Sequence, residues 1–266
     1  MRILGRLGAL PLAIVCGGCF QMTTIVKVAG DGSGTIDHSM LVSKAALAQL
    51  RNFGALGGGR GAQIDLTSED QARAMADTLG PGVAYISSSA VDTPMAQGRH
   101  STYAFSDIGQ VRISEQPRTD GLPIRSPALN AGGEITCAFT REAGGNAVLR
   151  INLPELNLSA LNTGDAAGSP GLAQQLAMVR ALLAGAHVLI AVEPAGQVVR
   201  TNSPYVDGSR VTLLDVNLDQ VLGNEAVLTR LQTAKTADDL KEALKDVPGV
   251  KIVLEREVVI EFTPAQ

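Results

Sequence analysis

Tryptophan is absent from this chain of 266 residues, and aromatic residues make up only 3% of it. Stacking platforms for nucleobases or sugars, and an aromatic belt at a membrane surface, are therefore poorly provided for. Positive charge is also limited, because 22 lysines and arginines stand against 26 aspartates and glutamates, and they form no basic run. A net charge of −4 without such a run offers no electrostatic footprint for nucleic acid or for an anionic membrane surface. We therefore exclude nucleic acid as a partner.

The motifs of common enzyme chemistry are missing as well. The sequence contains no G-x-S-x-G elbow, S-x-x-K, H-E-x-x-H or P-loop. His38, His100 and His187 each lie in or beside a predicted strand, and none has a ligand-type residue at the close spacing of a metal site. We predict no catalytic residue, no metal site and no cofactor. A cryptic hydrolase is the remaining enzyme alternative, and it would need Asp215 or Cys137 to meet a histidine in a cleft.

Residues 1–18 have the anatomy of a signal peptide. Two arginines precede the short apolar run LGALPLAIV, and Gly17-Gly18 lead into Cys19. The run is too short to span a bilayer, which takes about 20 apolar residues, and no later stretch approaches that length. The segment resembles the lipobox of bacterial lipoprotein signals, although Cys16 stands where an aliphatic residue is expected. We predict cleavage after residue 18 and acylation of Cys19.

An acylated Cys19 would make the membrane the first partner of this protein, because several acyl chains hold a protein firmly. Phe20 rather than Asp follows Cys19, and the resemblance to lipoproteins then implies the outer membrane, on its periplasmic side. Cys16 and Cys19 also read as a C-x-x-C redox pair or half a metal site, but cleavage would separate them and no second pair exists. Cys137 would be the only free thiol, and we expect a small buried residue there rather than a nucleophile.

Alternation of apolar and polar residues predicts a chain rich in hairpins. The expected hairpins span residues 22–42, 83–113, 134–153 and 187–201, and a further hairpin turn leads into a strand that ends at residue 215. The turns are expected at 30–34, 194–196 and 207–208. The expected helices span 43–53, 67–79, 170–184, 225–232 and 236–246. The pattern favours an α+β fold: a mostly antiparallel sheet built from hairpins, helices packed on one face, and a short helical C-terminal segment.

The same pattern suggests a division of the chain into three parts. Residues 1–18 form the signal peptide, 19–215 an α+β domain, and 216–266 a helical extension whose final strands rejoin the sheet. A helix followed by a hairpin occurs at 68–113 and again at 170–215, which raises the possibility of an internal duplication.

Three polar patterns are candidate ligand sites. The glycine-rich segment 54–63 lacks the features of a phosphate loop and reads as a connector. The series Asp31, Ser33, Thr35 and Asp37 has the oxygen spacing of early calcium-loop positions, but a calcium loop also needs a later bidentate Glu, and we favour a hairpin turn. A third set could line a ligand cleft or form a solvated hairpin face: Glu193, Arg200, Asn202, Tyr205, Asp207, Ser209 and Arg210.

Asp215 is an acid among apolar residues, in the segment Leu213-Leu214-Asp215-Val216. Burial beside Arg200 or Arg210 is one interpretation of this residue. We favour the other, that it is the N-cap of the helix that follows.

Several of these segments together resemble the LppM-type bacterial lipoprotein domain. They are Gly18-Cys19, Asp31-Gly32-Ser33-Gly34, EPAGQVVRTN at 193–202 and VDGSRVT at 206–212. In that family a lipidated cysteine precedes a D-G-T/S-G hairpin, and a later strand enters a Pro-Gly turn, a Thr/Ser-Asn step and a D-G-N/S hairpin. The resemblance covers residues 18–215 in loose order. Leu213 replaces the family's tryptophan, and the chain has a long C-terminal helical segment but no C-terminal membrane helix.

This resemblance implies a lipoprotein of the bacterial envelope, for which a lipid or glycolipid ligand has been suggested in a mycobacterial relative. It carries over no catalytic residue. We therefore expect a membrane-anchored, non-enzymatic binding module, with a protein-interaction subunit of an envelope assembly as the alternative. A lipid carrier should enclose an apolar pocket, whereas an interaction subunit should combine a closed core with an exposed apolar patch.

Overall fold

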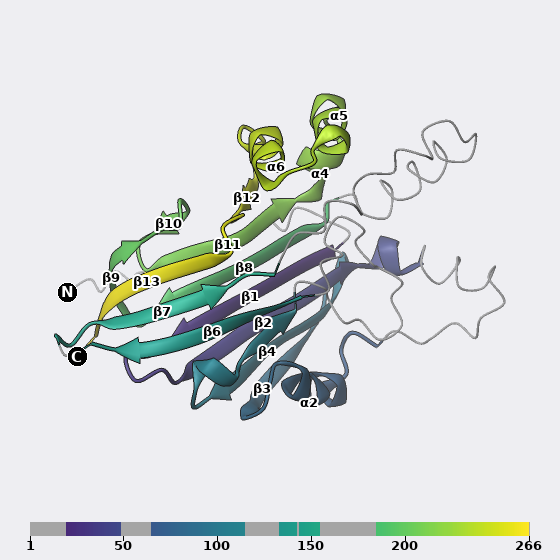
Figure 1. Cartoon of the computed structure of the whole chain (residues 1–266). Coiled ribbons are helices and arrows are strands. Elements are labelled where there is room, and N and C mark those ends of the chain that lie inside the picture. The colour runs from purple at the N-terminus through teal and green to yellow at the C-terminus, as the bar shows by residue number, and fades with distance from the viewer. Residues whose placement is uncertain (1–19, 49–64, 115–132, 143, 155–184, 266) are drawn as a thin grey trace, which may run out of the picture.

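The computed structural model describes residues 20–48, 65–114, 133–142, 144–154 and 185–265. Within them, two β-sheets pack against each other and short helices lie at the margins (Figure 1). The predicted signal peptide, Cys19, the glycine-rich segment 54–63 and the expected helix 170–184 lie outside the described residues.

The larger sheet, sheet A, contains the N-terminal strands. Its members are β1 (Phe20–Val28), β2 (Gly34–Ser43), β3 (Val83–Asp92), β4 (Ala96–Phe105), β8 (His187–Pro194), β10 (Val206–Asp207), β11 (Arg210–Asn217) and β12 (Val250–Ile252). The order is β10-β11-β8-β1-β2-β4-β3, with β12 also paired to β11. In the described part of the sheet, β1 and β8 are parallel neighbours and the other pairs are antiparallel.

The smaller sheet, sheet B, is antiparallel. It contains β5 (Arg112–Ser114), β6 (Glu134–Arg141), β7 (Ala147–Asn152), β9 (Gly196–Thr201) and β13 (Glu257–Pro264), in the order β5-β6-β7-β13-β9. The helices are α2 (Glu69–Thr78), a 3-10 turn η1 (Ile108–Gln110), α4 (Leu218–Leu222), α5 (Glu225–Thr233) and α6 (Ala237–Leu244), and residues 44–48 are also helical. None of the described helices is long and apolar enough to cross a membrane.

The core lies between the two sheets. Every second residue of β1 from Phe20 to Val28 is buried, and in β13 Val258, Ile260 and Phe262 are buried in the same alternation. Except for the polar Thr24 and for Phe262, these inward-facing side chains belong to one apolar cluster that includes both sheets. Because apolar burial is the main favourable term in folding, the cluster fixes the two sheets against each other.

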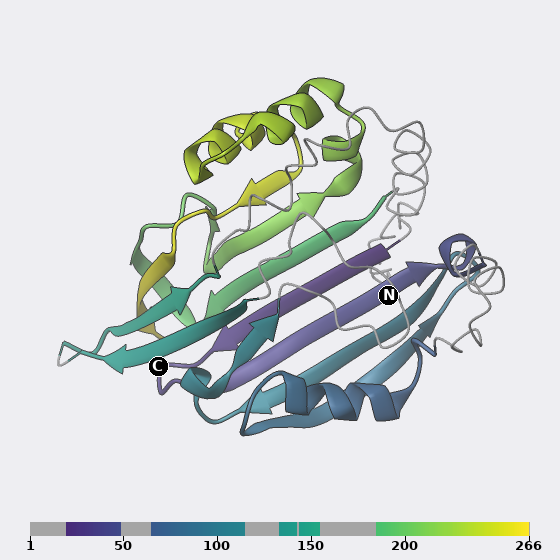
Figure 2. The ribbon, with the colours of Figure 1, turned by 45° about the vertical axis from the view of Figure 1, so that its right-hand side comes forward.

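The predicted fold class is wrong in its central feature. The structure is mostly β, with two large sheets, and helices do not form a covering face. Sheet B occupies the inner face of sheet A where helices were expected, while α2 lies by β3 and β4, and α4 to α6 gather beyond β11 and β12 (Figure 2). The reason is that alternation reveals the apolar face of each strand but not the element that covers it.

Hairpins with local turns were predicted correctly. The pairs β1–β2, β3–β4, β6–β7 and β10–β11 are antiparallel hairpins, and α5 and α6 lie where helices were expected. Two predictions failed where the chain changes sheets. The strand expected to run to Ile113 ends at Phe105, and β9 does not return along β8 but joins β13 in sheet B. The hairpin of the second helix-hairpin unit is therefore divided between the two sheets. In the first unit β3 and β4 remain together in sheet A, and only its last residues, in β5, join sheet B.

Candidate functional site

A hollow of about 670 Å³ opens at one end of the sandwich, where both sheets and the C-terminal segment meet. Its walls come from the start of β9, the β10–β11 turn and the end of β13. The lining residues are Gly196, Gln197, Val198, Gly208, Ser209, Thr263, Pro264 and Ala265. The volume is in the range of small-molecule sites, and the lining combines uncharged polar side chains with small apolar ones.

Glycines shape the backbone around this hollow. A Cβ atom on Gly196 would lie 2.0 Å from the carbonyl oxygen of Thr263, so only glycine lets β9 approach β13 this closely. Gly208 has a φ of +59°, which the tight turn between β10 and β11 requires. The Pro194-Ala195-Gly196 and Asp207-Gly208 turns expected from the sequence thus both border the hollow.

Backbone hydrogen bonds hold the same end together. The amide of Ala195 donates to the carbonyl of Val28 at 2.7 Å, and the amide of Ala265 donates to the carbonyl of Ala195 at 2.9 Å. The end of β1, the β8–β9 connection and the C-terminal segment are therefore joined at one point. The hollow therefore lies beside a hydrogen-bonded junction between the two sheets.

The polar residues expected to line a ligand cleft mostly serve other roles. Ser209 lines the hollow, whereas Glu193 and Arg210 form an ion pair of 2.6 Å on sheet A, and Arg200 pairs with Glu261 at 3.2 Å. The side chain of Asn202 bridges β9 and β13: its amide donates to the carbonyl of Glu257 at 2.9 Å, and its oxygen accepts from the amide of Val259 at 2.8 Å. Tyr205 packs against the core, and Asp207 is exposed.

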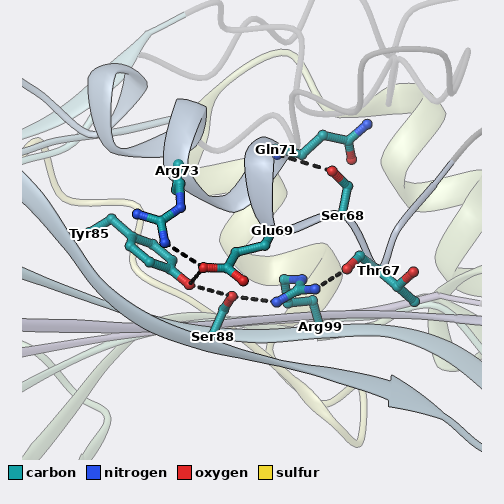
Figure 3. A network of polar contacts seen from close by, with 8 residues as sticks. All are labelled: Thr67, Ser68, Glu69, Gln71, Arg73, Tyr85, Ser88 and Arg99. Atoms are coloured by element: carbon teal, nitrogen blue, oxygen red, sulfur yellow. Dashed lines mark hydrogen bonds and ion pairs between the residues drawn. The ribbon is translucent and has the colours of Figure 1, made fainter.

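A second polar cluster, between α2 and the β3–β4 edge, was not predicted from the sequence (Figure 3). The guanidinium of Arg99 donates to the carbonyl of Thr67 and to the hydroxyl of Ser88, and that hydroxyl lies 2.7 Å from the hydroxyl of Tyr85. Tyr85 donates in turn to Glu69 at 3.2 Å.

Arg73 completes this cluster from the exposed side of α2. It pairs with Glu69 at 2.5 Å and lies over the ring of Tyr85, 4.5 Å from the ring centre. These contacts hold the pKa of Glu69 below its usual value, chiefly through the hydrogen bond from Arg73. The cluster connects α2 to the edge strand β3. Arg99, Ser101 and Tyr103 alternate along β4 and therefore lie on the same, inward face of the strand. A charged residue at such a position was the one sign of this cluster in the sequence.

The hydrolase alternative depends on Asp215 or Cys137 meeting a histidine. The Nε2 atom of His187 lies 2.7 Å from Oδ1 of Asp215, and Lys251 Nζ is 4.0 Å from Oδ2 of the same carboxylate. This pair is on the opposite end of sheet A from the hollow, as the pairing of His187 with Gln21 shows. Cys137 is buried in sheet B, and burial raises the pKa of its thiol to about 12, which suppresses the reactive thiolate.

Two other sequence interpretations can be compared with the structure. Asp215 is not the N-cap of the next helix, since Asn217 caps α4 by accepting from the amide of Asp219. Asp31 accepts hydrogen bonds from the amide and hydroxyl of Ser33, which confirms the hairpin turn. Asp37 lies further along β2, where it pairs with Lys27 at 2.8 Å, so the oxygens of the proposed calcium series do not converge.

His38 is the buried histidine of sheet A. It faces the core from β2, and its Nδ1 atom lies 3.0 Å from the hydroxyl of Thr24 on β1. Desolvation lowers the pKa of His38 to about 4, so the side chain is neutral at neutral pH. His100 is exposed on β4.

No family model matches the chain, and no curated protein matches it either. Among solved structures, the NMR structure of the folded domain of LppM from Mycobacterium tuberculosis covers 97% of each chain, with 12% sequence identity and a TM-score of 0.33. The structural similarity to this lipoprotein domain is weak.

Proposed function

We propose that this chain is a lipoprotein of the bacterial envelope, anchored through acylated Cys19, and that its β-sandwich is a non-enzymatic binding module. The hollow at the junction of the two sheets is the proposed ligand site. The observation that carries this proposal is a site-sized hollow whose walls depend on Gly196 and Gly208, held in place by backbone hydrogen bonds.

The composition of the walls favours an uncharged, polar ligand group. Gln197, Ser209 and Thr263 supply hydrogen-bonding side chains, while Val198 and Pro264 supply apolar surface. Small-molecule sites commonly combine apolar walls with a few polar groups that fix the ligand's orientation. The hydroxyl-rich headgroup of a glycolipid has this chemistry, and its acyl chains would remain outside the hollow.

Filling the hollow tests this site. Full-length wild-type protein and a Gln197→Trp variant are extracted in detergent, and co-purified lipids are identified by mass spectrometry. Gln220→Trp, on the exposed surface of α4, is the matched control. We expect a lipid enriched with the wild type and the control but lost from Gln197→Trp. The same lipids from all three proteins, or none enriched, would contradict the proposal.

The anchor is tested separately by Cys19→Ser. Without acylation the protein should move from the membrane fraction to the soluble fraction. Complete retention in the membrane fraction would show that something other than the lipid holds it there.

A protein-interaction role is the second candidate, and the edge strand β3 favours it. β3 is ten residues long and carries one charged residue, Asp92, at its end, and its pairing with β4 shifts register at Ile86. The other edge strands of the described sheets, β5, β9, β10 and β12, are shorter. Long uncharged edges accept an added strand from a partner protein. A photo-reactive residue at the exposed Ile86 should then crosslink to a partner in cells, and Ser87→Lys with Ser89→Lys should abolish the crosslink.

A further inference from the structure

We propose that the end of the sandwich at which β1 begins lies on the bilayer surface, with Met95 of the β3–β4 turn inserted among the lipid headgroups. This inference rests on the proposed acylation of Cys19. It adds a second, non-covalent membrane contact and a defined orientation of the body.

The first step is the absence of a tether. β1 begins at Phe20, the residue directly after the proposed anchor. Phe20 is paired with Val42 and its side chain is buried in the core. An acyl chain on Cys19 would therefore be attached next to the first residue of a central strand, and this end of sheet A would stay close to the membrane.

The second step places Met95 at this same end. Ser43, next to Val42, pairs with Ala96, and the amide of Lys44 donates to the carbonyl of Met95 at 2.9 Å. Because β2 lies between β1 and β4, these two strands are two strand spacings apart, or about 10 Å. Met95 therefore lies beside the anchor point, at the same level along the strands.

The third step is the chemistry of the turn. Met95 is 64% exposed, the most exposed of the large hydrophobic side chains in the described residues. Beside it, Lys44 and Asp92 form an ion pair of 2.6 Å, so the two charges that flank the turn balance each other. A flexible apolar side chain within a charge-balanced rim fits a zwitterionic lipid surface and requires no anionic lipid.

The lack of native tryptophan makes a direct test possible. Acylated Met95→Trp protein is reconstituted in phosphatidylcholine vesicles that contain brominated lipid, and the quenching of its fluorescence is measured. Val206→Trp is the matched control, because Val206 is also exposed (43%) but lies about 25 Å further along the strands, at the end with the hollow.

We expect quenching severalfold greater for Met95→Trp than for Val206→Trp, and a shift of its emission to shorter wavelength. Equal quenching at the two positions, or none at position 95 in protein that is bound to vesicles, would overturn the inference. Failure of the acylated protein to bind vesicles at all would instead overturn the proposed anchor.

A measurement on the native side chain avoids any affinity that the indole itself has for the interface. Methionine oxidation by peroxide, followed by mass spectrometry, is compared between acylated protein on vesicles and soluble Cys19→Ser protein. Met95 should be oxidised several times more slowly on vesicles, while the half-buried Met75 of α2 should oxidise at the same rate in both. Equal rates for Met95 would count against the inference.

Discussion

The buried pair of His38 and Thr24 makes the stability of the sandwich depend on pH in a calculable way. His38 is neutral in the folded state because desolvation lowers its pKa from 6.5 to about 4. One pKa unit corresponds to about 1.4 kcal/mol, so the two states differ by about 3 kcal/mol in their affinity for this proton.

The sign follows from which state binds the proton first. Above pH 6.5 the histidine is neutral in both states, and its full contribution to stability is present. Between pH 6.5 and about 4 the unfolded chain binds a proton that the folded protein does not, so the free energy of unfolding falls. Below about pH 4 the loss attributable to His38 is complete.

Urea unfolding at a series of pH values from 7.5 to 4 measures this loss. Carboxylates such as Glu69 also destabilise the fold on acidification, but they are common to wild type and variant and cancel in the difference. The stability advantage of the wild type over His38→Asn should therefore shrink by about 3 kcal/mol across the range.

Thr24→Val separates the hydrogen bond from the titration. It should cost about 1 kcal/mol at pH 7.5, because a buried partner is lost, and it should keep the wild-type pH dependence. Parallel curves for wild type and His38→Asn would refute the reasoning, since they would mean that the folded protein accepts the proton as readily as the unfolded chain.

Two further predictions follow from the packing around the hollow and in sheet B. Gly196→Ala should lower the free energy of unfolding by about 1–3 kcal/mol, because the new methyl group would meet the Thr263 carbonyl; Gly144→Ala, with nothing within 4 Å, should change it little, and equal effects in thermal or urea unfolding would contradict this. Cys137, buried and with its pKa raised to about 12, should react with a thiol reagent at pH 8 only after denaturation, in a chain whose other two cysteines are replaced by serine. Rapid labelling of the native protein would show that sheet B opens at Cys137.

Local signals in the sequence predicted local structure well. Gly144-Gly145-Asn146 lies between two alternating strands, and the β6–β7 hairpin forms there because its turn residues and strands are adjacent. Thr236 and Asp239 form the capping box that starts α6. In both elements the partners lie within a few residues of each other, so composition and spacing suffice.

The division into two sheets depended on partners far apart in the chain. β9 leaves β8 because β13, which begins 56 residues after Thr201, offers it an antiparallel edge. The hollow also depends on residues far apart in the chain. The sequence identified Gly196 as a turn residue, but it did not show that Thr263 lies next to Gly196 in space. The Arg99 cluster likewise depends on an inward-facing charge meeting the N-terminus of α2, which no spacing within the sequence reveals.

The parallel pairing of β1 with β8 has a consequence for how the protein is made. β1 is the first strand and a central member of sheet A, yet its partner β8 starts at His187. In sheet B, β13 lies between β7 and β9, and it ends at Pro264. Both sheets therefore need strands from the last third of the chain before they are complete. Pairing strands so far apart in the sequence closes long loops, which slows folding. The sandwich of this chain can therefore be completed only after nearly all of the chain has been synthesised.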